Sequence, residues 1–200
     1  HKTFREYQEL KKDCEALKSR LVGLQEVLIE NKRYEKLLEF KRNLIFSSAV
    51  ATVIGRDPSN WNAAMIIDKG KRDGLEVGMP VVSPLGVVGK IAEVASSTGK
   101  VILLNDPNFS VAALVETSRE GGLVSGSLQG LCRMRYLSPK ADIQKGDSVI
   151  TSHLSSSFPE GLLIGKVVAV YESQSSPGLE CLVEPAVVFS QLEEVIVIKK

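Results

Sequence analysis

The N-terminal part of the chain carries a stripe of residues whose spacing alternates strictly between three and four. The stripe consists of Tyr7, Leu10, Cys14, Leu17, Leu21, Leu24 and Leu28. This spacing is the seven-residue repeat of a coiled coil, in which two positions in every seven face a partner helix. A single helix has nothing to pack against such a stripe. We therefore expect residues 1–44 to form one long helix that self-associates through it.

The stripe weakens beyond Leu28, where Asn31 and then Glu35 take the next positions of the repeat. Asn31 is either a buried polar residue that fixes the register of the paired helices or the point at which tight pairing ends. Cys14 lies on the stripe, and a parallel partner in register would bring its own copy close. The spacing leaves open the sense of the pair and a Cys14 cross-link.

Composition limits the classes of function. The formal net charge of +1 excludes the strongly basic surface expected of a general nucleic-acid-binding protein. No run approaches the roughly 18 apolar residues that cross a bilayer. The chain begins at His1 without a Met, so we expect it to be a fragment of a longer protein. Besides Cys14 it has Cys132 and Cys181, whose wide spacing fits neither a disulfide framework nor a zinc site.

After Phe46 the chain changes to short runs of Val, Ile and Leu separated by Gly, Pro, Asn, Asp and Ser, which is typical of antiparallel β structure. The expected strands lie near 46–54, 63–67, 79–82, 87–94, 101–104, 111–115, 122–125, 132–137, 148–151, 164–170, 180–185 and 195–198. Because no long amphipathic helix separates them, a parallel βαβ sheet is excluded, and closed barrels or sandwiches remain.

An internal repeat favours barrels. The segment from Gly78 to Ile91 resembles the segment from Gly146 to Val167: in each, a glycine turn opens a short strand, and a second glycine-bracketed strand ends in a lysine. Two small six-stranded antiparallel barrels, each with one such hairpin, explain the repeat better than a single sheet. The glycines expected to form structural turns are Gly70, Gly74, Gly78, Gly86, Gly89, Gly146, Gly161 and Gly165.

No catalytic template fits the chain. Gly146-Asp147-Ser148 is the sequence that precedes the nucleophile of chymotrypsin-like hydrolases, which are also double barrels, and the alternative function is a hydrolase that uses Ser148 and His153. However, Val149 stands where the oxyanion loop needs glycine, and the chain order of serine and histidine is wrong for that class. Phosphate-loop and metal-ligand spacings are lacking as well, so we predict neither an enzyme nor a cofactor.

Trp61 follows Pro58-Ser59-Asn60 in a turn-rich segment. It is either an exposed anchor for a partner protein or a plug over one end of a barrel.

Several motifs stand out by their order and spacing. They are Glu30-Asn31-Lys32-Arg33 with Leu37-Leu38, Val53-Ile54-Gly55-Arg56-Asp57-Pro58 with Trp61, Ile67-Asp68-Lys69-Gly70 with Gly74 and Gly78, Gly86-Val87-Val88-Gly89-Lys90, and Gly146-Asp147-Ser148-Val149-Ile150-Thr151-Ser152 with Phe158-Pro159-Glu160-Gly161 and Gly165. As a set, they resemble the MreC family of bacterial rod shape-determining proteins over nearly the whole chain.

The resemblance implies a domain order and a location. A transmembrane helix precedes His1 and anchors the protein, as a single-pass protein, in the cytoplasmic membrane. The present part then lies outside that membrane, in a periplasm or a wall space. The coiled coil (1–44) leads into a first barrel (46–98 plus 186–200), and a second barrel (99–185) of chymotrypsin-like topology is inserted before the last strand.

The resemblance also implies a function and partners. The protein is a non-enzymatic scaffold of the elongasome that forms homodimers and higher assemblies, and it positions or activates peptidoglycan-synthesis enzymes for lateral wall growth. Its partners are MreD, the actin-like MreB system, RodA and a class B penicillin-binding protein. Exposed strand edges offer a further route to end-to-end association of dimers.

Overall fold

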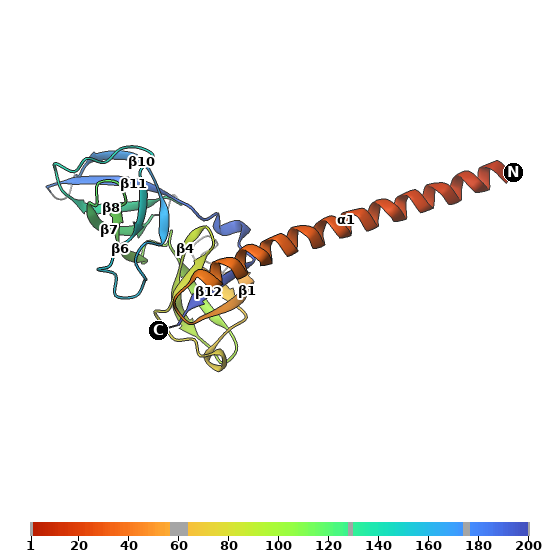
Figure 1. The fold of residues 1–200 in the computed structure, drawn as a ribbon, viewed down its shortest axis with the longest axis horizontal. Coiled ribbons are helices and arrows are strands. Elements are labelled where there is room, and N and C mark those ends of the chain that lie inside the picture. Colours follow the sequence, from red (N-terminus) through yellow and green to blue (C-terminus); the bar gives the residue numbers. More distant parts are fainter. Residues whose placement is uncertain (1, 57–63, 128–129, 174–176, 200) are drawn as a thin grey trace. The chain divides into compact units, whose positions relative to one another are not determined.

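The computed structural model describes residues 2–56, 64–127, 130–173 and 177–199. The chain forms two units, His1–Asn43 and Leu44–Lys200. The first unit is one long helix, and the second contains two closed six-stranded antiparallel barrels (Figure 1). This arrangement confirms the predicted fold class.

Helix α1 (Lys2–Asn43) spans 42 residues, about 63 Å at 1.5 Å per residue. It contains no proline and a single glycine, Gly23, so few of its residues disfavour helix. Lys41 and Arg42 lie in the last turn, where cations favour the negative end of the helix dipole. Among the described residues, no helix combines the length and the apolar character that a membrane span needs.

The first barrel is built from the beginning and the end of the second unit. Its strands are β1 (Ser48–Arg56), β2 (Ala64–Ile67), β3 (Pro80–Ser83), β4 (Gly86–Val94), β5 (Gly99–Leu103) and β12 (Glu194–Ile198), with the short 3₁₀ helices η1 (Lys71–Asp73) and η2 (Phe189–Gln191) outside the sheet. Strand β12 pairs with both β1 and β3. The second barrel is therefore an insertion before the last strand of the first. Met65, Ile67 and Val81 are among the side chains buried in the core.

One expected boundary is wrong. The sequence analysis assigned residues 99–185 to the second barrel, but β5 forms a hairpin with β4 and also pairs with β2. The first barrel therefore extends to Leu103, and the second begins with β6 at Ser110. Strand β5 (Gly99–Leu103) and the strand that follows it, Ser110–Val115, are both short and apolar, so local composition does not show which barrel either strand joins.

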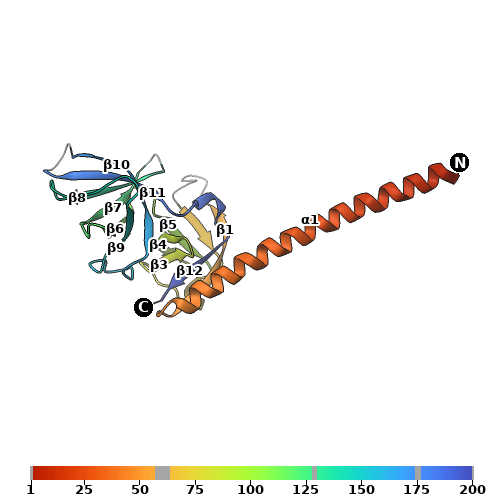
Figure 2. The same cartoon turned by 45° about the horizontal axis from the view of Figure 1, so that its top comes forward.

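The second barrel holds six consecutive strands (Figure 2). They are β6 (Ser110–Val115), β7 (Gly121–Gly126), β8 (Cys132–Leu137), β9 (Ser148–Thr151), β10 (Leu163–Glu172) and β11 (Leu179–Pro185). Phe109 and Phe158 meet edge to face, with ring centroids 5.9 Å apart. Both rings belong to a core that also contains Met134 and Ile164.

The two barrels have the same strand order when β12 is counted as the first strand of its barrel. The rings then are β12-β3-β4-β5-β2-β1 and β6-β9-β10-β11-β8-β7. The repeated segments of the sequence become the hairpins β3–β4 and β9–β10, which occupy the same place in each ring. The backbone N–H groups of Gly78 and Gly146 make matching 2.8 Å bonds, to the carbonyls of Ile91 and Val167. The internal repeat therefore corresponds to a repeat in structure.

The barrels pack directly against one another. Val87 and Leu104, from the first barrel and the segment that follows it, are part of the buried cluster that forms the core of the second barrel. At Gly86 the backbone passes so close to the carbonyl oxygen of Leu163 that a Cβ atom would overlap it. A residue with a side chain would therefore not fit at Gly86. The two barrels share one packed region.

Both barrels are closed, so each of the twelve described strands has a neighbour on either side. The open strand edges that the sequence analysis considered for end-to-end association are absent from these strands, because closure satisfies the backbone groups that an edge would expose.

Candidate interaction surfaces

The stripe on α1 is exposed along its whole length. Its large apolar members, Tyr7, Leu10, Leu17, Leu21, Leu24 and Leu28, expose between 58% and 70% of their surface, and Cys14 is exposed too. Apolar side chains at this spacing lie on one face of the helix. Contiguous exposed apolar faces are typical of protein interaction sites.

Between Tyr7 and Asn31, three further large apolar residues are exposed but lie off the stripe: Val22, Val27 and Ile29. The sequence analysis missed them because it followed only the two-in-seven repeat. Val27 directly precedes Leu28 and borders the stripe, while Val22 and Ile29 are seven residues apart on another face. Their spacing was a signal that a search for a second stripe would have found.

Asn31 is exposed at the end of the stripe, and polar contacts surround it. The Tyr34 hydroxyl donates a 3.0 Å hydrogen bond to Glu30 Oε1, one helical turn away. The Arg33 guanidinium lies over the Tyr34 ring, 5.7 Å from its centroid. The apolar face of α1 thus gives way to polar side chains near Asn31, as the sequence indicated.

Five of the eight predicted turn glycines have positive φ: Gly74, Gly78, Gly86, Gly146 and Gly161. Gly70 lies in an extended conformation just before η1.

Gly89 and Gly165 are not turn residues, which corrects the prediction. They lie inside β4 and β10, at equivalent places in the two barrels. A Cβ atom would overlap the carbonyl oxygen of Ile102 at Gly89 and that of Glu184 at Gly165. Glycine is needed there because the neighbouring strand passes too close for any side chain.

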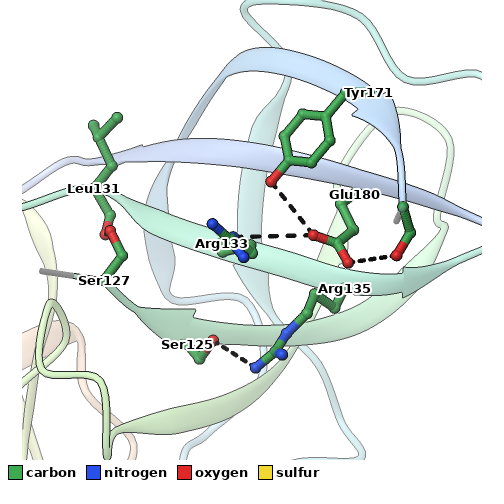
Figure 3. Close-up of polar contacts among 8 residues, drawn as sticks. Ser125, Ser127, Leu131, Arg133, Arg135, Tyr171 and Glu180 are labelled. Atoms are coloured by element: carbon green, nitrogen blue, oxygen red, sulfur yellow. Dashed lines mark hydrogen bonds and ion pairs between the residues drawn. The ribbon is translucent and has the colours of Figure 1, made fainter. Parts of the chain in front are cut away.

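A buried carboxylate joins three strands on the outer face of the second barrel (Figure 3). Glu180 of β11 is only 4% exposed. It accepts a 2.6 Å hydrogen bond from Ser173 Oγ and a longer one of 3.4 Å from the Tyr171 hydroxyl, and it lies 3.9 Å from Arg133 Nε. On the same face, Arg135 Nη2 donates to Ser125 Oγ at 3.2 Å.

This network is a structural element of the second barrel. A buried carboxylate is tolerated where hydrogen bonds and a cation compensate its lost hydration. Burial raises the pKa of Tyr171, the neighbouring Arg133 cation opposes this rise, and Glu180 adds to it. Tyr171 is therefore a hydrogen-bond donor to Glu180 at neutral pH. The sequence analysis missed the network because its members come from β8, β10 and β11, whose pairing is not visible locally.

Ser148 and His153 do not form a catalytic pair. Ser148 opens β9, and His153 lies beyond its end at Thr151. Strand geometry alone separates residues 148 and 151 by about 10 Å, and Ser152 N–H still bonds to the Ala112 carbonyl at 3.0 Å, as in a continuing strand. A nucleophile and its base need side-chain contact at about 3 Å.

The described residues offer no metal site either: no group of three or more His, Cys, Asp or Glu side chains is arranged to hold an ion. Cys132 and Cys181 are fully buried, and burial raises the pKa of both thiols to about 12. They act as small core side chains.

The barrels expose a few large apolar side chains. Val77 and Leu85 lie in the first barrel, and Tyr136 and Leu154 in the second. Leu154 borders a cavity of about 290 Å³ whose lining also includes Lys90 and Phe158. Trp61, the predicted partner contact, lies outside the described residues.

The helix with its exposed stripe and the two closed barrels define a double-barrel protein led by a coiled-coil-type helix. Residues 53–199 match the family model of the rod shape-determining protein MreC, barrel core. The chain therefore belongs to the MreC family.

Relatives and solved structures agree with this assignment. The chain is 29% identical over 204 residues to the cell shape-determining protein MreC of Listeria monocytogenes, covering 99% of this chain and 69% of that protein. It is 30% identical over 211 residues to the Bacillus subtilis protein of the same name, covering 99% and 73%. A solved MreC structure superposes with a TM-score of 0.80 at 28% identity, covering 86% of this chain and 99% of that chain.

Two more distant structures share the fold alone. One is the major periplasmic domain of the cell shape-determining filament MreC, with a TM-score of 0.66 at 21% identity and coverage of 76% of this chain and 95% of that one. The other is MreC from Helicobacter pylori in complex with the penicillin-binding protein PBP2, with a TM-score of 0.63 at 14% identity and coverage of 78% and 99%.

Proposed function

We propose that this chain is the extracytoplasmic part of a non-enzymatic cell-shape scaffold. It self-associates through the stripe on α1 and positions or activates peptidoglycan-synthesis enzymes for lateral wall growth. The observation that carries the proposal is the stripe itself, whose six large apolar side chains are all more than half exposed in a single chain. Fully burying one such side chain contributes about 1.5–3 kcal/mol, which gives a second helix a clear reason to bind.

Membership of the family supports a location outside the cytoplasmic membrane. One relative in fold is a periplasmic domain of MreC, and we place this chain likewise outside the cytoplasmic membrane, in a periplasm or a wall space. A single transmembrane helix that precedes residue 1 in the full-length protein anchors it there. Both placements rest on membership of the family.

The barrels are the surfaces for partners. The Helicobacter pylori relative was solved bound to PBP2, which supports a class B penicillin-binding protein as a direct partner here. MreD, RodA and the MreB system complete the expected assembly. Tyr136 and Leu154 on the second barrel and Val77 on the first are exposed apolar residues suited to such contacts.

Sedimentation equilibrium tests self-association. We expect the wild-type chain to form dimers and Leu21→Lys, which puts a charge on the stripe, to be monomeric. Val22→Lys is the matched control: it makes the same change at the neighbouring residue, which is equally exposed but off the stripe. A wild-type chain that stays monomeric at high concentration contradicts the proposal, and so does equal dissociation by both variants.

A binding assay with the extracytoplasmic domain of a class B penicillin-binding protein tests the scaffold role. We expect the wild-type chain to bind, and Leu154→Asp or Tyr136→Ala to weaken binding if the second barrel is the contact. Val77→Asp reports on the first barrel in the same way. The absence of binding to the wild-type dimer would contradict the proposed partner.

A further inference from the structure

A cavity of about 290 Å³ is lined by residues of both barrels. The first barrel contributes Lys90 of β4, and the second contributes the start of β6, Leu123 of β7 and residues 154–158 of the connection between β9 and β10. Ligand cavities in proteins have volumes of about 300–1,000 Å³, so this one suits a small ligand. The proposed scaffold function gives this cavity no role.

The connection that forms one wall of the cavity is held in place by its own contacts. The Phe158 N–H donates to Ser155 Oγ at 3.1 Å, and Thr151 Oγ1 donates to the Pro159 carbonyl at 2.6 Å. The Phe158 ring is buried and packs edge to face on Phe109. Because these contacts form the wall before a ligand arrives, binding does not have to order it.

Lys90 is the only charged side chain among the described residues that line the cavity. The residue is partly buried, and its ammonium lies 5.6 Å from the centroid of the Phe109 ring. No carboxylate of the described residues lies within ion-pair distance of Lys90 Nζ, and Glu93 of the same strand pairs with Lys100 at 3.5 Å. A partly buried cation without a counterion favours an anionic ligand.

The internal repeat shows that the lack of a counterion is particular to Lys90. Lys166 is its equivalent in the second barrel, since each lysine directly follows the closely packed glycine of its hairpin. Lys166 lies opposite Glu184 on the neighbouring strand. Opposite charges on neighbouring strands attract, so the charge of Lys166 is offset within its own barrel. Lys90 instead lies opposite Ile102 and Pro80, which carry no charge.

The rest of the lining supplies hydroxyl groups and apolar side chains. Ser157 makes no hydrogen bond with any described residue, through either its N–H or its hydroxyl. The Ser155 hydroxyl accepts a bond from the Phe158 N–H, so its own proton can still be donated. Leu123 and Leu154 add apolar surface. Together with the lysine, these groups fit an anion that carries a small apolar substituent.

We propose that the cavity binds the free carboxylate at the end of a short peptide whose last side chain is small and apolar. The carboxylate pairs with Lys90 and accepts hydrogen bonds from Ser157, and such charge-assisted bonds are the strong ones. The last side chain packs against Leu154. Capture of a terminal carboxylate is a recurring mode of peptide recognition. Such a site goes beyond the proposed scaffold function and does not depend on it.

An NMR titration of the full chain tests the site with two probes, N-acetyl-alanyl-alanine and the same peptide with a terminal amide. We expect the carboxylate probe to shift the amide signals of Ala112, Ser155 and Ser157. The amide probe should bind at least about tenfold more weakly, because it has no charge to pair with Lys90. The absence of binding by the carboxylate probe overturns the proposal, and so does equal binding of the two probes.

Lys90→Met removes the charge but keeps a side chain of similar length over Phe109. We expect it to bind the carboxylate probe at least about tenfold more weakly. Lys166→Met is the matched control, because it makes the same change at the equivalent place in the second barrel, outside the lining of the cavity. It should bind within about twofold of the wild type. Equal losses in the two variants contradict the proposed site.

Ser157→Ala tests the site without a change in β4, and so keeps the test open if Lys90→Met does not fold. Loss of a hydrogen bond to the carboxylate should weaken binding about threefold or more. Unchanged affinity of this variant contradicts the proposed role of the connection.

The stereochemistry of the probe separates two sources of such a peptide. The carboxyl ends of proteins consist of L residues, whereas peptides of bacterial cell walls end in D-alanine. Tighter binding of the L,L probe indicates a protein terminus, and tighter binding of the D,D probe indicates a wall peptide. Either preference supports a carboxylate site.

Discussion

Large apolar side chains are buried in the barrels but exposed along the stripe of the helix. In the barrels, Met65, Ile67, Phe109 and Ile164 are completely buried by residues of the same chain. In α1, every large residue of the stripe is more than half exposed. The barrel unit thus completes its hydrophobic core by itself, whereas the helix leaves its apolar stripe exposed. Under the proposed function, the barrels provide stability and the stripe provides association.

The largest expected effect is a loss of stability when the close packing of two strands in the second barrel is disrupted. Gly165→Ala places a Cβ atom where the Glu184 carbonyl oxygen stands, so the backbone of β10 or β11 has to move. We expect a loss of about 3 kcal/mol or more in the free energy of unfolding, at the upper end of overpacking effects. Denaturant unfolding monitored by near-UV circular dichroism measures it.

Gly55→Ala is the matched control for that change. Gly55 also lies in a strand, but the nearest atoms to its added Cβ are 3.9 Å away, on the side chain of Ile66. This variant should unfold within about 1 kcal/mol of the wild type. Equal effects of the two substitutions would show that close strand packing is not the reason for glycine at 165.

The next largest expected effect is a fall in stability at alkaline pH, which arises from the buried thiols. Burial raises the pKa of Cys181 from 9.0 to about 12. Between those values the unfolded chain binds fewer protons than the folded one, so stability falls as pH rises above 9. At pH 10 we expect this thiol to lower the free energy of unfolding by on the order of 1 kcal/mol relative to neutral pH. Unfolding curves of wild type and Cys181→Ala at pH 7 and pH 10 measure that difference.

Cys14→Ser serves as the control, because Cys14 is exposed on α1 and outside the barrel unit. It should leave the pH dependence of barrel unfolding unchanged. If Cys181→Ala keeps the full wild-type loss of stability at pH 10, the buried thiol is not its cause.

The smallest expected effect is tighter self-association when the helix itself is stabilised. A Cβ at Gly23 meets nothing within 4 Å, so Gly23→Ala adds helix propensity of about 1 kcal/mol per helix without new contacts. We expect tighter self-association in sedimentation equilibrium and an unchanged denaturant midpoint for the barrels. A shift of the barrel midpoint by the same amount would contradict the separation of the two regions.

The helix and the strands could be predicted because each follows a local periodicity in the sequence. The spacing of the stripe and the alternation of short apolar runs with turn residues each depend on near neighbours, and α1 and all twelve strands lie close to the predicted ranges. The repeat of Gly78 and Gly146 even indicated two barrels. These are patterns that a single segment carries.

The features that the sequence did not predict depend on which strands, distant in the sequence, become neighbours in the fold. Nothing near Gly99 indicates that β5 stays in the first barrel, and Gly89 and Gly165 look like turn glycines until the strands beside them are known. The Glu180 network is invisible for the same reason, since Arg133, Tyr171 and Glu180 meet only after three strands pair.

Hydrogen exchange at several protein concentrations tests the central claim most directly, because it reports on the helix and the barrels in the same sample. Dilution through the dissociation constant of the dimer should make the amides around Leu17 to Leu28 exchange faster, while barrel amides such as those of Val81 and Val183 keep their protection. Helix protection that is independent of concentration would contradict the claim that α1 depends on a second copy.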